Sequence, residues 1–144
     1  MNEGTSYEEY LDRYGRLTYS SVGVSMLPLL RQGRDLFIIE RKGRERCRAG
    51  DVVLYRRPPD KYVLHRIVRV RLDDYVILGD NCIHKEYGIR DEDIIGVMTG
   101  FVRDGREHSV KEAGYMTYSF LQLYLSPVRI SLTKAAFRLR RLIH

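Results

Sequence analysis

The sequence predicts a mainly β protein, in which an antiparallel β domain lies between a short N-terminal helix and a C-terminal amphipathic helical tail. Between residues 35 and 102, short runs rich in Val, Ile, Leu and Tyr alternate with Gly, Pro and Asp, a pattern typical of strands and turns. No helical stretch between these runs is long enough for a parallel crossover, so the sheet is predicted to be antiparallel. Before and after this region the apolar residues recur at helical spacing instead.

The N-terminal helix is predicted to begin after Ser6 and to end at Gly15. Ser6 and Glu9 have the spacing of a capping box, and a glycine is a common helix terminator. Between them the apolar side chains recur at helical spacing; they are Tyr7, Tyr10, Leu11 and Tyr14.

Five strands are predicted next, and a second helix follows them. The strands cover residues 36–40, 51–57, 62–71, 75–78 and 94–102. Ser126 and Pro127 have the residue types of a helix cap and first helical position, so the second helix is predicted to begin there. One side of it is apolar, with Val128, Leu132, Ala135, Ala136, Leu139 and Leu142. The domain boundaries are therefore an N-terminal helical segment at 1–20, a β-rich domain at 21–112 and a helical tail at 113–144.

Length and composition indicate one soluble globular domain. The chain has 144 residues, of which 44% are hydrophobic and 31% charged, which suits a folded domain and leaves no room for a second. Residues 1–20 hold neither a membrane-spanning run nor a secretion signal, so we expect a cytoplasmic location. Cys47 and Cys82 are too few for a disulfide scaffold and are predicted to be free thiols.

The net charge of +6 is unevenly placed, because residues 113–144 contain basic side chains and no acidic one. No recognisable nucleic-acid-binding motif accompanies this charge, so nucleic-acid binding is not expected. The tail also carries a Tyr-rich apolar stretch from Tyr115 to Leu125. Peripheral contact with an anionic membrane, here the inner face of the cell membrane, fits both features. Three alternatives stay open, namely packing on the β core, a homodimer and an acidic protein partner.

Four short segments carry candidate chemistry: residues 23–28 around Ser25, 50–55 from Gly50 to Tyr55, 63–68 around His65, and 79–81 around Asp80. Taken singly, each has an ordinary structural explanation. Ser25 is a serine in a Gly/Pro turn, His65 is a half-buried strand residue, and Asp80 lies in a tight turn.

Their order along the chain changes this interpretation. Gly-x-Ser-Met-x-Pro, Gly-Asp-Val-Val, a strand with a base followed by Arg-Ile-Val, and Gly-Asp-Asn together resemble the type I signal peptidase family and its relatives, the self-cleaving repressors of the SOS response. The resemblance covers about residues 21 to 100 and implies the family's antiparallel β catalytic fold. It implies that Ser25 is the nucleophile and that His65 stands where the bacterial membrane enzymes have a lysine base. A peptide or protein substrate with small residues at the cleaved bond is then expected beside a strand, in a pocket that includes Gly23, Ser25, Met26 and Pro28.

The chemistry of these residues agrees with that assignment. A serine needs a neighbouring base, and an unperturbed histidine accepts a proton at neutral pH, which predicts a rate that rises through about pH 6 to 7. The backbone N–H of Ser25 is expected to donate to the oxyanion without help from a side chain, because Gly23 has no hydroxyl that could donate as well. Asp80 is the first candidate to orient His65; Glu86, Asp91 or no carboxylate at all stay open. No cofactor or metal is expected.

Two departures from the family narrow the expected activity. No transmembrane segment is recognised before the first of the four segments, at residues 23–28, which disfavours an ordinary secretory signal peptidase. The Ala-Gly pairs at Ala49 and Ala113 lie downstream of Ser25, which disfavours self-cleavage. We therefore expect a serine endopeptidase that cleaves leader or signal-like peptides in trans. A catalytically silent peptide-binding module and a membrane or nucleic-acid adaptor are the alternatives.

Overall fold

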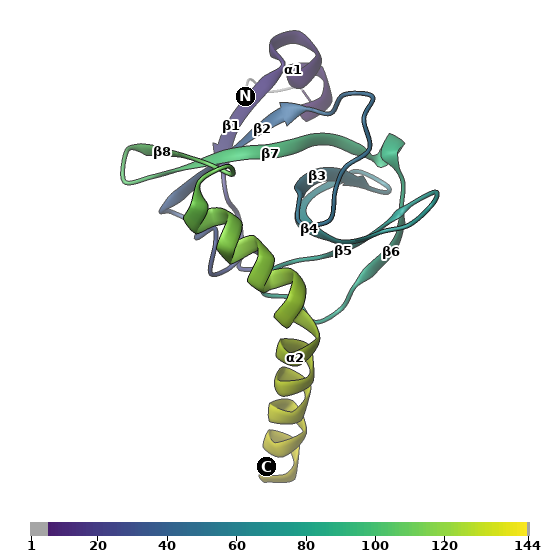
Figure 1. Cartoon of the computed structure of the whole chain (residues 1–144), viewed down its shortest axis with the longest axis vertical. Helices are drawn as coiled ribbons and strands as arrows, with labels where there is room; N and C mark the ends of the chain where they lie inside the picture. The colour runs from purple at the N-terminus through teal and green to yellow at the C-terminus, as the bar shows by residue number, and fades with distance from the viewer. Residues whose placement is uncertain (1–5, 144) are drawn as a thin grey trace.

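The computed structural model describes residues 6–143 and shows a mixed α/β protein (Figure 1). Helix α1 (Tyr7–Tyr14) precedes an eight-stranded antiparallel sheet, and helix α2 (Ala113–Ile143) follows it. The strands are β1 (Arg16–Ser20), β2 (Asp35–Arg41), β3 (Val52–Arg57), β4 (Lys61–Val70), β5 (Tyr75–Leu78), β6 (Glu86–Ile89), β7 (Ile94–Arg103) and β8 (Arg106–Ser109), with a short 3-10 helix at Asp91–Asp93. The predicted antiparallel sheet and its two flanking helices are confirmed. The class is mixed rather than mainly β because α2 alone has 31 residues.

The strands follow the order β1-β2-β7-β3-β4-β5-β6, and β8 pairs with β7. All five predicted strands are present, as β2, β3, β4, β5 and β7. The sequence prediction missed β1, β6 and β8. These strands are only four or five residues long and largely polar, so their own pattern is weak and pairing with β2, β5 and β7 defines them.

Helix α1 forms as its end residues predict. The Ser6 hydroxyl accepts a hydrogen bond from the Glu9 N–H at 3.1 Å, and Gly15 ends the helix with a φ of 74°. A left-handed conformation of this kind favours glycine. Leu11 is 1% exposed and attaches the helix to the main core.

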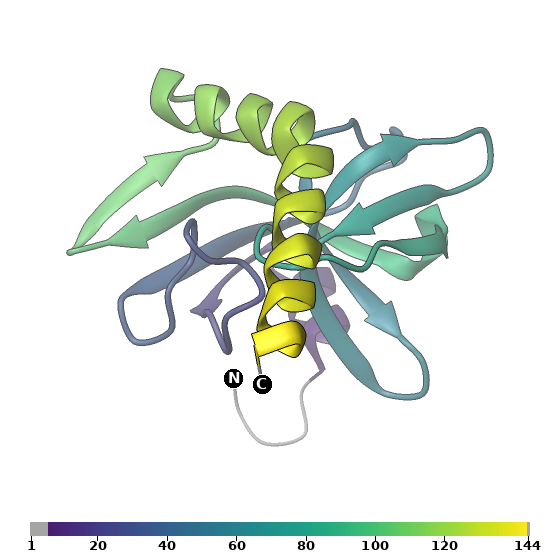
Figure 2. The same ribbon diagram turned by 90° about the horizontal axis from the view of Figure 1, so that it is seen from below.

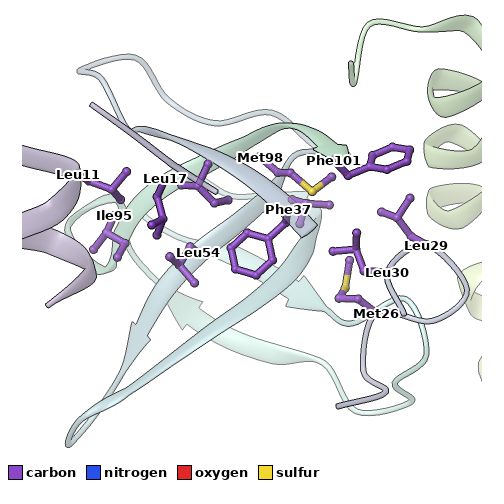
Figure 3. Close-up of a cluster of buried hydrophobic side chains, with 12 residues drawn as sticks. Leu11, Leu17, Met26, Leu29, Leu30, Phe37, Leu54, Ile95, Met98 and Phe101 are labelled. Atoms are coloured by element: carbon purple, nitrogen blue, oxygen red, sulfur yellow. The ribbon is translucent and has the colours of Figure 1, made fainter. Parts of the chain in front are cut away.

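The main core extends from Leu11 on α1 to Phe101 and Leu29 near the start of α2 (Figure 3). Met26 and Leu30, which belong to the turn after Ser25, are 4% and 0% exposed within it. Burial of these side chains fixes the backbone on either side of them. The core therefore holds the segment that carries the candidate nucleophile.

Helix α2 begins at Ala113, well before the start that was predicted at Pro127. Pro127 lies inside the helix, and the Ser126 hydroxyl donates to the Leu123 carbonyl instead of capping a helix start. Proline lacks an N–H and crowds the preceding turn, which bends a helix without necessarily ending it. The axis of α2 changes direction in this part of its length (Figure 2). No helix within residues 6–143 is long and apolar enough to cross a membrane.

Candidate active site

Ser25 lies in the turn between β1 and β2 and is half-buried. The loop after β5 holds its backbone in place. The Asn81 N–H donates to the Ser25 carbonyl at 2.9 Å, and the Asn81 side-chain amide donates to the Val24 carbonyl at 3.1 Å. The candidate nucleophile is thus attached to the Gly-Asp-Asn segment, about 55 residues further along the chain.

His65 lies on β4, opposite Val53 of β3, and is 8% exposed. Gly79 shows how close the three segments come. A Cβ atom at Gly79 would stand 2.8 Å from the Ser25 carbonyl oxygen and 3.0 Å from Cδ2 of His65. Only a residue without a side chain fits there, so Gly79 allows the Ser25 turn, β4 and the loop after β5 to meet.

The segment from Gly50 to Tyr55 has a different place. The Gly50 carbonyl accepts from Arg66 at 2.9 Å, and the Asp51 carboxylate accepts from the Arg48 N–H at 2.8 Å. This segment therefore shapes the start of β3 and supports β4. Tyr55, at its end, is the member that reaches His65.

The Ser25 hydroxyl makes no hydrogen bond, to His65 or elsewhere, in the part of the chain that the structure describes. The direct contact expected of a nucleophile and its base is therefore not formed. The Ser25 backbone and the His65 ring nevertheless both lie close to Gly79. The position of Oγ then depends on one torsion angle, χ1 of Ser25.

Burial lowers the pKa of His65 to about 4, with a further lowering from the charge of Arg57 and an opposing effect from Asp80. The imidazole is consequently neutral at pH 7 and able to accept a proton. A reaction that used His65 as its base should accelerate with pH through about 4, rather than through about 6 to 7 as an unperturbed histidine would give.

The same pKa predicts how stability depends on pH. In the unfolded chain His65 takes up a proton as the pH falls below its ordinary pKa of 6.5, whereas the folded state resists protonation down to about 4. The unfolded state thus binds more protons in this window, and the free energy of unfolding should fall by roughly 3 kcal/mol between pH 6.5 and 4. Urea denaturation of wild type and His65→Gln across this range measures it. An equal pH dependence in both proteins would contradict the assignment.

The nearest hydrogen-bond partner of His65 is a tyrosine. Tyr55 Oη lies 3.4 Å from His65 Nδ1 and donates its proton to Glu86 at 2.9 Å. Glu86 also accepts from Arg57. A phenol has one proton, so a Tyr55 that donates to Glu86 can only accept from His65. This assigns the proton of His65 to Nδ1 and leaves Nε2 free as the basic nitrogen.

Asp80 is paired with Arg66. Arg66 Nε and Nη2 donate to the two Asp80 oxygens at 2.8 Å each, and Tyr118 of α2 donates to Asp80 at 2.7 Å. Both charged side chains are 1% exposed. Burial acts to lower the pKa of Arg66, but Asp80 outweighs it and raises that pKa. The expected role of Asp80 in orienting His65 thus stays a prediction, while its hydrogen bonds attach β4 to α2.

Arg66 and Tyr55 are site residues that the sequence interpretation did not single out. Arg66 follows His65 on β4, so the two side chains point to opposite faces of the sheet. Its neighbours in the strand are mostly Val, Leu and Ile, and a cation buried among such residues needs an acidic partner. That requirement was a usable signal for Arg66. Tyr55 carried none, because a tyrosine in an apolar strand is an ordinary core residue. Asp91, another carboxylate that could have oriented His65, accepts instead from Tyr75 and Lys42.

A pocket of about 140 Å³ opens beside Ser25. Its lining consists of Ser21, Val22, Ser25, Met26, Phe37, Tyr62, Val63 and Leu64. Of the four residues expected in a substrate pocket, Ser25 and Met26 line this one, whereas Gly23 and Pro28 are exposed and lie outside its lining.

Next to this pocket, β4 has an open edge. β3 pairs with β4 from Lys61 to Arg66, but β5 pairs with it only from Arg66 onward. Along a strand, the backbone N–H and C=O groups of successive residues point to opposite edges. Ile67 forms its backbone hydrogen bonds with Gly50 and Asp51, on the side of β3. Tyr62 and Leu64 are an odd number of residues away, so their backbone groups point to the other, open edge. Their backbone groups are available to an extended peptide beside Ser25.

Of the backbone N–H groups of Gly23 and Ser25, one is available to donate to an oxyanion. Gly23 has a φ of 78° and donates its N–H to Gln32 at 2.8 Å, so this N–H is occupied. The Ser25 N–H donates to no acceptor among residues 6–143. It is thus the free donor at the nucleophile.

The two cysteines are free and occupy separate environments. Cys47 is buried, and burial raises the pKa of its thiol to about 11. Cys82 lies near the site, with Sγ 3.9 Å from the Ser25 carbonyl oxygen, and burial raises its pKa too. Both thiols are protonated at neutral pH and are weak nucleophiles.

No known relative was found. Neither a protein-family model, nor a curated protein, nor a solved structure matches the chain. Within residues 6–143 there is also no cluster of three or more side chains that could hold a metal ion.

Proposed function

We propose that this protein is a serine endopeptidase similar to type I signal peptidases, with Ser25 as nucleophile and His65 as general base. The observation that carries the proposal is the meeting of the Ser25 turn, the His65 ring and Gly79 beside an open strand edge. A nucleophile, a neutral base and a peptide-binding edge are the three components that peptide cleavage requires.

The proposed reaction begins when an extended peptide pairs with the open edge of β4. His65 Nε2 removes the proton from Ser25 Oγ as Oγ attacks the scissile carbonyl carbon, and the Ser25 N–H donates to the developing oxyanion. The imidazolium then donates that proton to the leaving amine as the C–N bond breaks. Water, deprotonated by His65, hydrolyses the acyl ester and regenerates Ser25.

The size of the pocket supports the preference for small residues that the resemblance implies. A pocket of about 140 Å³ suits a small side chain at the cleaved bond and is too small for a large aromatic one. Leader or signal-like peptides with alanine-sized residues are the proposed substrates. Profiling with a peptide library tests this, and a preference for bulky or charged residues at the cleaved bond would contradict it.

Tyr55 is proposed as a positioning residue for His65, with Glu86 as the carboxylate behind it. Tyr55→Phe keeps the buried ring and removes the hydroxyl that fixes the His65 tautomer. We expect kcat to fall about 10- to 100-fold with little change in KM, since the effect resembles the loss of an outer hydrogen-bond partner. Tyr75→Phe, which removes another buried hydroxyl away from Ser25, is the matched control. Equal kcat in wild type and Tyr55→Phe would refute this role.

A serine-reactive fluorophosphonate tests the proposal without a known substrate. Mass spectrometry should place the label on Ser25, and His65→Ala should slow the labelling strongly. A catalytically silent peptide-binding module is the second candidate, because the Ser25 hydroxyl and His65 share no hydrogen bond in the described structure. That module would bind library peptides, resist the probe and cleave none of them.

A further inference from the structure

We propose that the outer part of α2, from residue 120 to residue 143, binds the surface of an anionic lipid bilayer, through an exposed apolar stripe and the basic side chains around it. The proposal concerns a surface away from the Ser25 pocket and does not depend on the peptidase assignment. It rests on three features of α2, namely its exposed residues, its attachment to the β domain and its charge.

The stripe lies along one face of α2, because its residues are separated by three, four or seven positions, spacings that bring side chains to the same side of a helix. They are between 47% and 83% exposed. The stripe consists of Leu121, Leu125, Val128, Leu132, Leu139 and Leu142. The alternative in which this apolar side packs on the β core is wrong for these residues. Soluble proteins rarely expose so long an apolar strip without a binding partner.

Other side chains of α2 attach the helix to the β domain and leave the stripe accessible. Tyr118 donates to Asp80 at 2.7 Å, the Ser119 hydroxyl accepts from Arg66 at 2.7 Å, and Ser126 is 5% exposed. Beyond the bend the helix extends away from the sheet (Figure 1). A flat surface can therefore reach the outer part of α2 without displacing the β domain.

The charge of α2 points to an anionic surface. Lys134, Arg138, Arg140 and Arg141 are exposed, and no acidic residue occurs between Ala113 and Ile143. Basic residues combined with an apolar face are typical of helices that lie in the interface of a membrane rather than across it. Phe120 and Tyr124, whose ring centroids are 4.2 Å apart, are also exposed near the stripe and suit the depth of lipid headgroups.

A second copy of the chain fits this surface less well. Pairing two stripes would bring together two basic helices, and neither supplies a carboxylate to balance the other. An anionic bilayer supplies negative charge for the basic side chains of α2 and an apolar phase for its stripe.

Vesicle co-sedimentation of the full chain tests the proposal. We expect binding to phosphatidylcholine vesicles that contain phosphatidylglycerol, weaker binding at high salt, and little binding to phosphatidylcholine alone. Arg138→Gln/Arg140→Gln/Arg141→Gln should weaken binding by about fivefold per charge, or on the order of 100-fold in total. Arg44→Gln/Arg48→Gln/Arg69→Gln removes the same charge from exposed positions outside α2 and should have a much smaller effect.

The apolar contribution has its own pair of variants. Leu132→Gln/Leu139→Gln should abolish sedimentation, whereas Leu72→Gln, at a leucine that is 89% exposed in the β4–β5 turn, should not. Failure to bind anionic vesicles at low salt would overturn the proposal. Sedimentation velocity without lipid shows the alternative, since a dimer that Leu132→Gln/Leu139→Gln converts to a monomer would assign the stripe to a second copy.

Discussion

Ser25→Ala and His65→Ala should each reduce peptide cleavage by at least about 10⁴-fold, and the double variant should lose little more than either single one. The two groups act in one proton transfer, so removing either leaves the other without a function. Cleavage of a peptide selected from a library, followed by mass spectrometry, measures the losses. Additive losses would mean that the two residues act separately.

Ser20→Ala is the matched control for the nucleophile. Ser20 is an exposed serine at the end of β1 and lies outside the lining of the pocket. This variant should retain cleavage and labelling. Turnover close to wild type in Ser25→Ala would exclude Ser25 as the nucleophile, and circular dichroism would establish that each variant is folded.

Breaking the Arg66–Asp80 pair should strongly destabilise the fold. Asp80→Asn leaves a guanidinium that is 1% exposed without its charge partner, which costs roughly 3 to 5 kcal/mol. Urea denaturation of Asp80→Asn and Arg66→Met measures the loss. Arg66→Met/Asp80→Leu should recover a large part of it, because an apolar pair of similar volume leaves no buried charge.

The same variants separate two roles for Asp80. As the anchor of β4 and α2, Asp80 should affect stability first, and Tyr118→Phe should show a smaller loss of the same kind because it removes one hydrogen bond to that carboxylate. As the orienting group of His65, Asp80→Asn would instead keep normal stability and lose about 10⁴-fold in kcat. That second result would show that Asp80 orients His65, and it would contradict the positioning role proposed for Tyr55.

The sequence by itself determined most of the secondary structure. Ser6, Gly15 and the apolar spacing between them specify α1, and alternation of apolar residues with turn residues specifies the five main strands. These signals are readable because they depend on residues close together in the chain. Ser25 and His65 were singled out by the order of the four segments and the family resemblance that this order carries, and their catalytic roles remain predictions.

The tertiary structure decided which side chains meet. Asp80 binds Arg66 and Tyr118, while Tyr55 and Glu86 lie next to His65, and these contacts join residues that are distant in sequence. Local spacing carries no information about such pairs, because strand order and packing bring them together. Helix α2 shows the same limit. Pro127 predicts a helix start from local preference alone, but attachment of Tyr118 and Ser119 to the β domain supports a helix that begins earlier and continues through the proline.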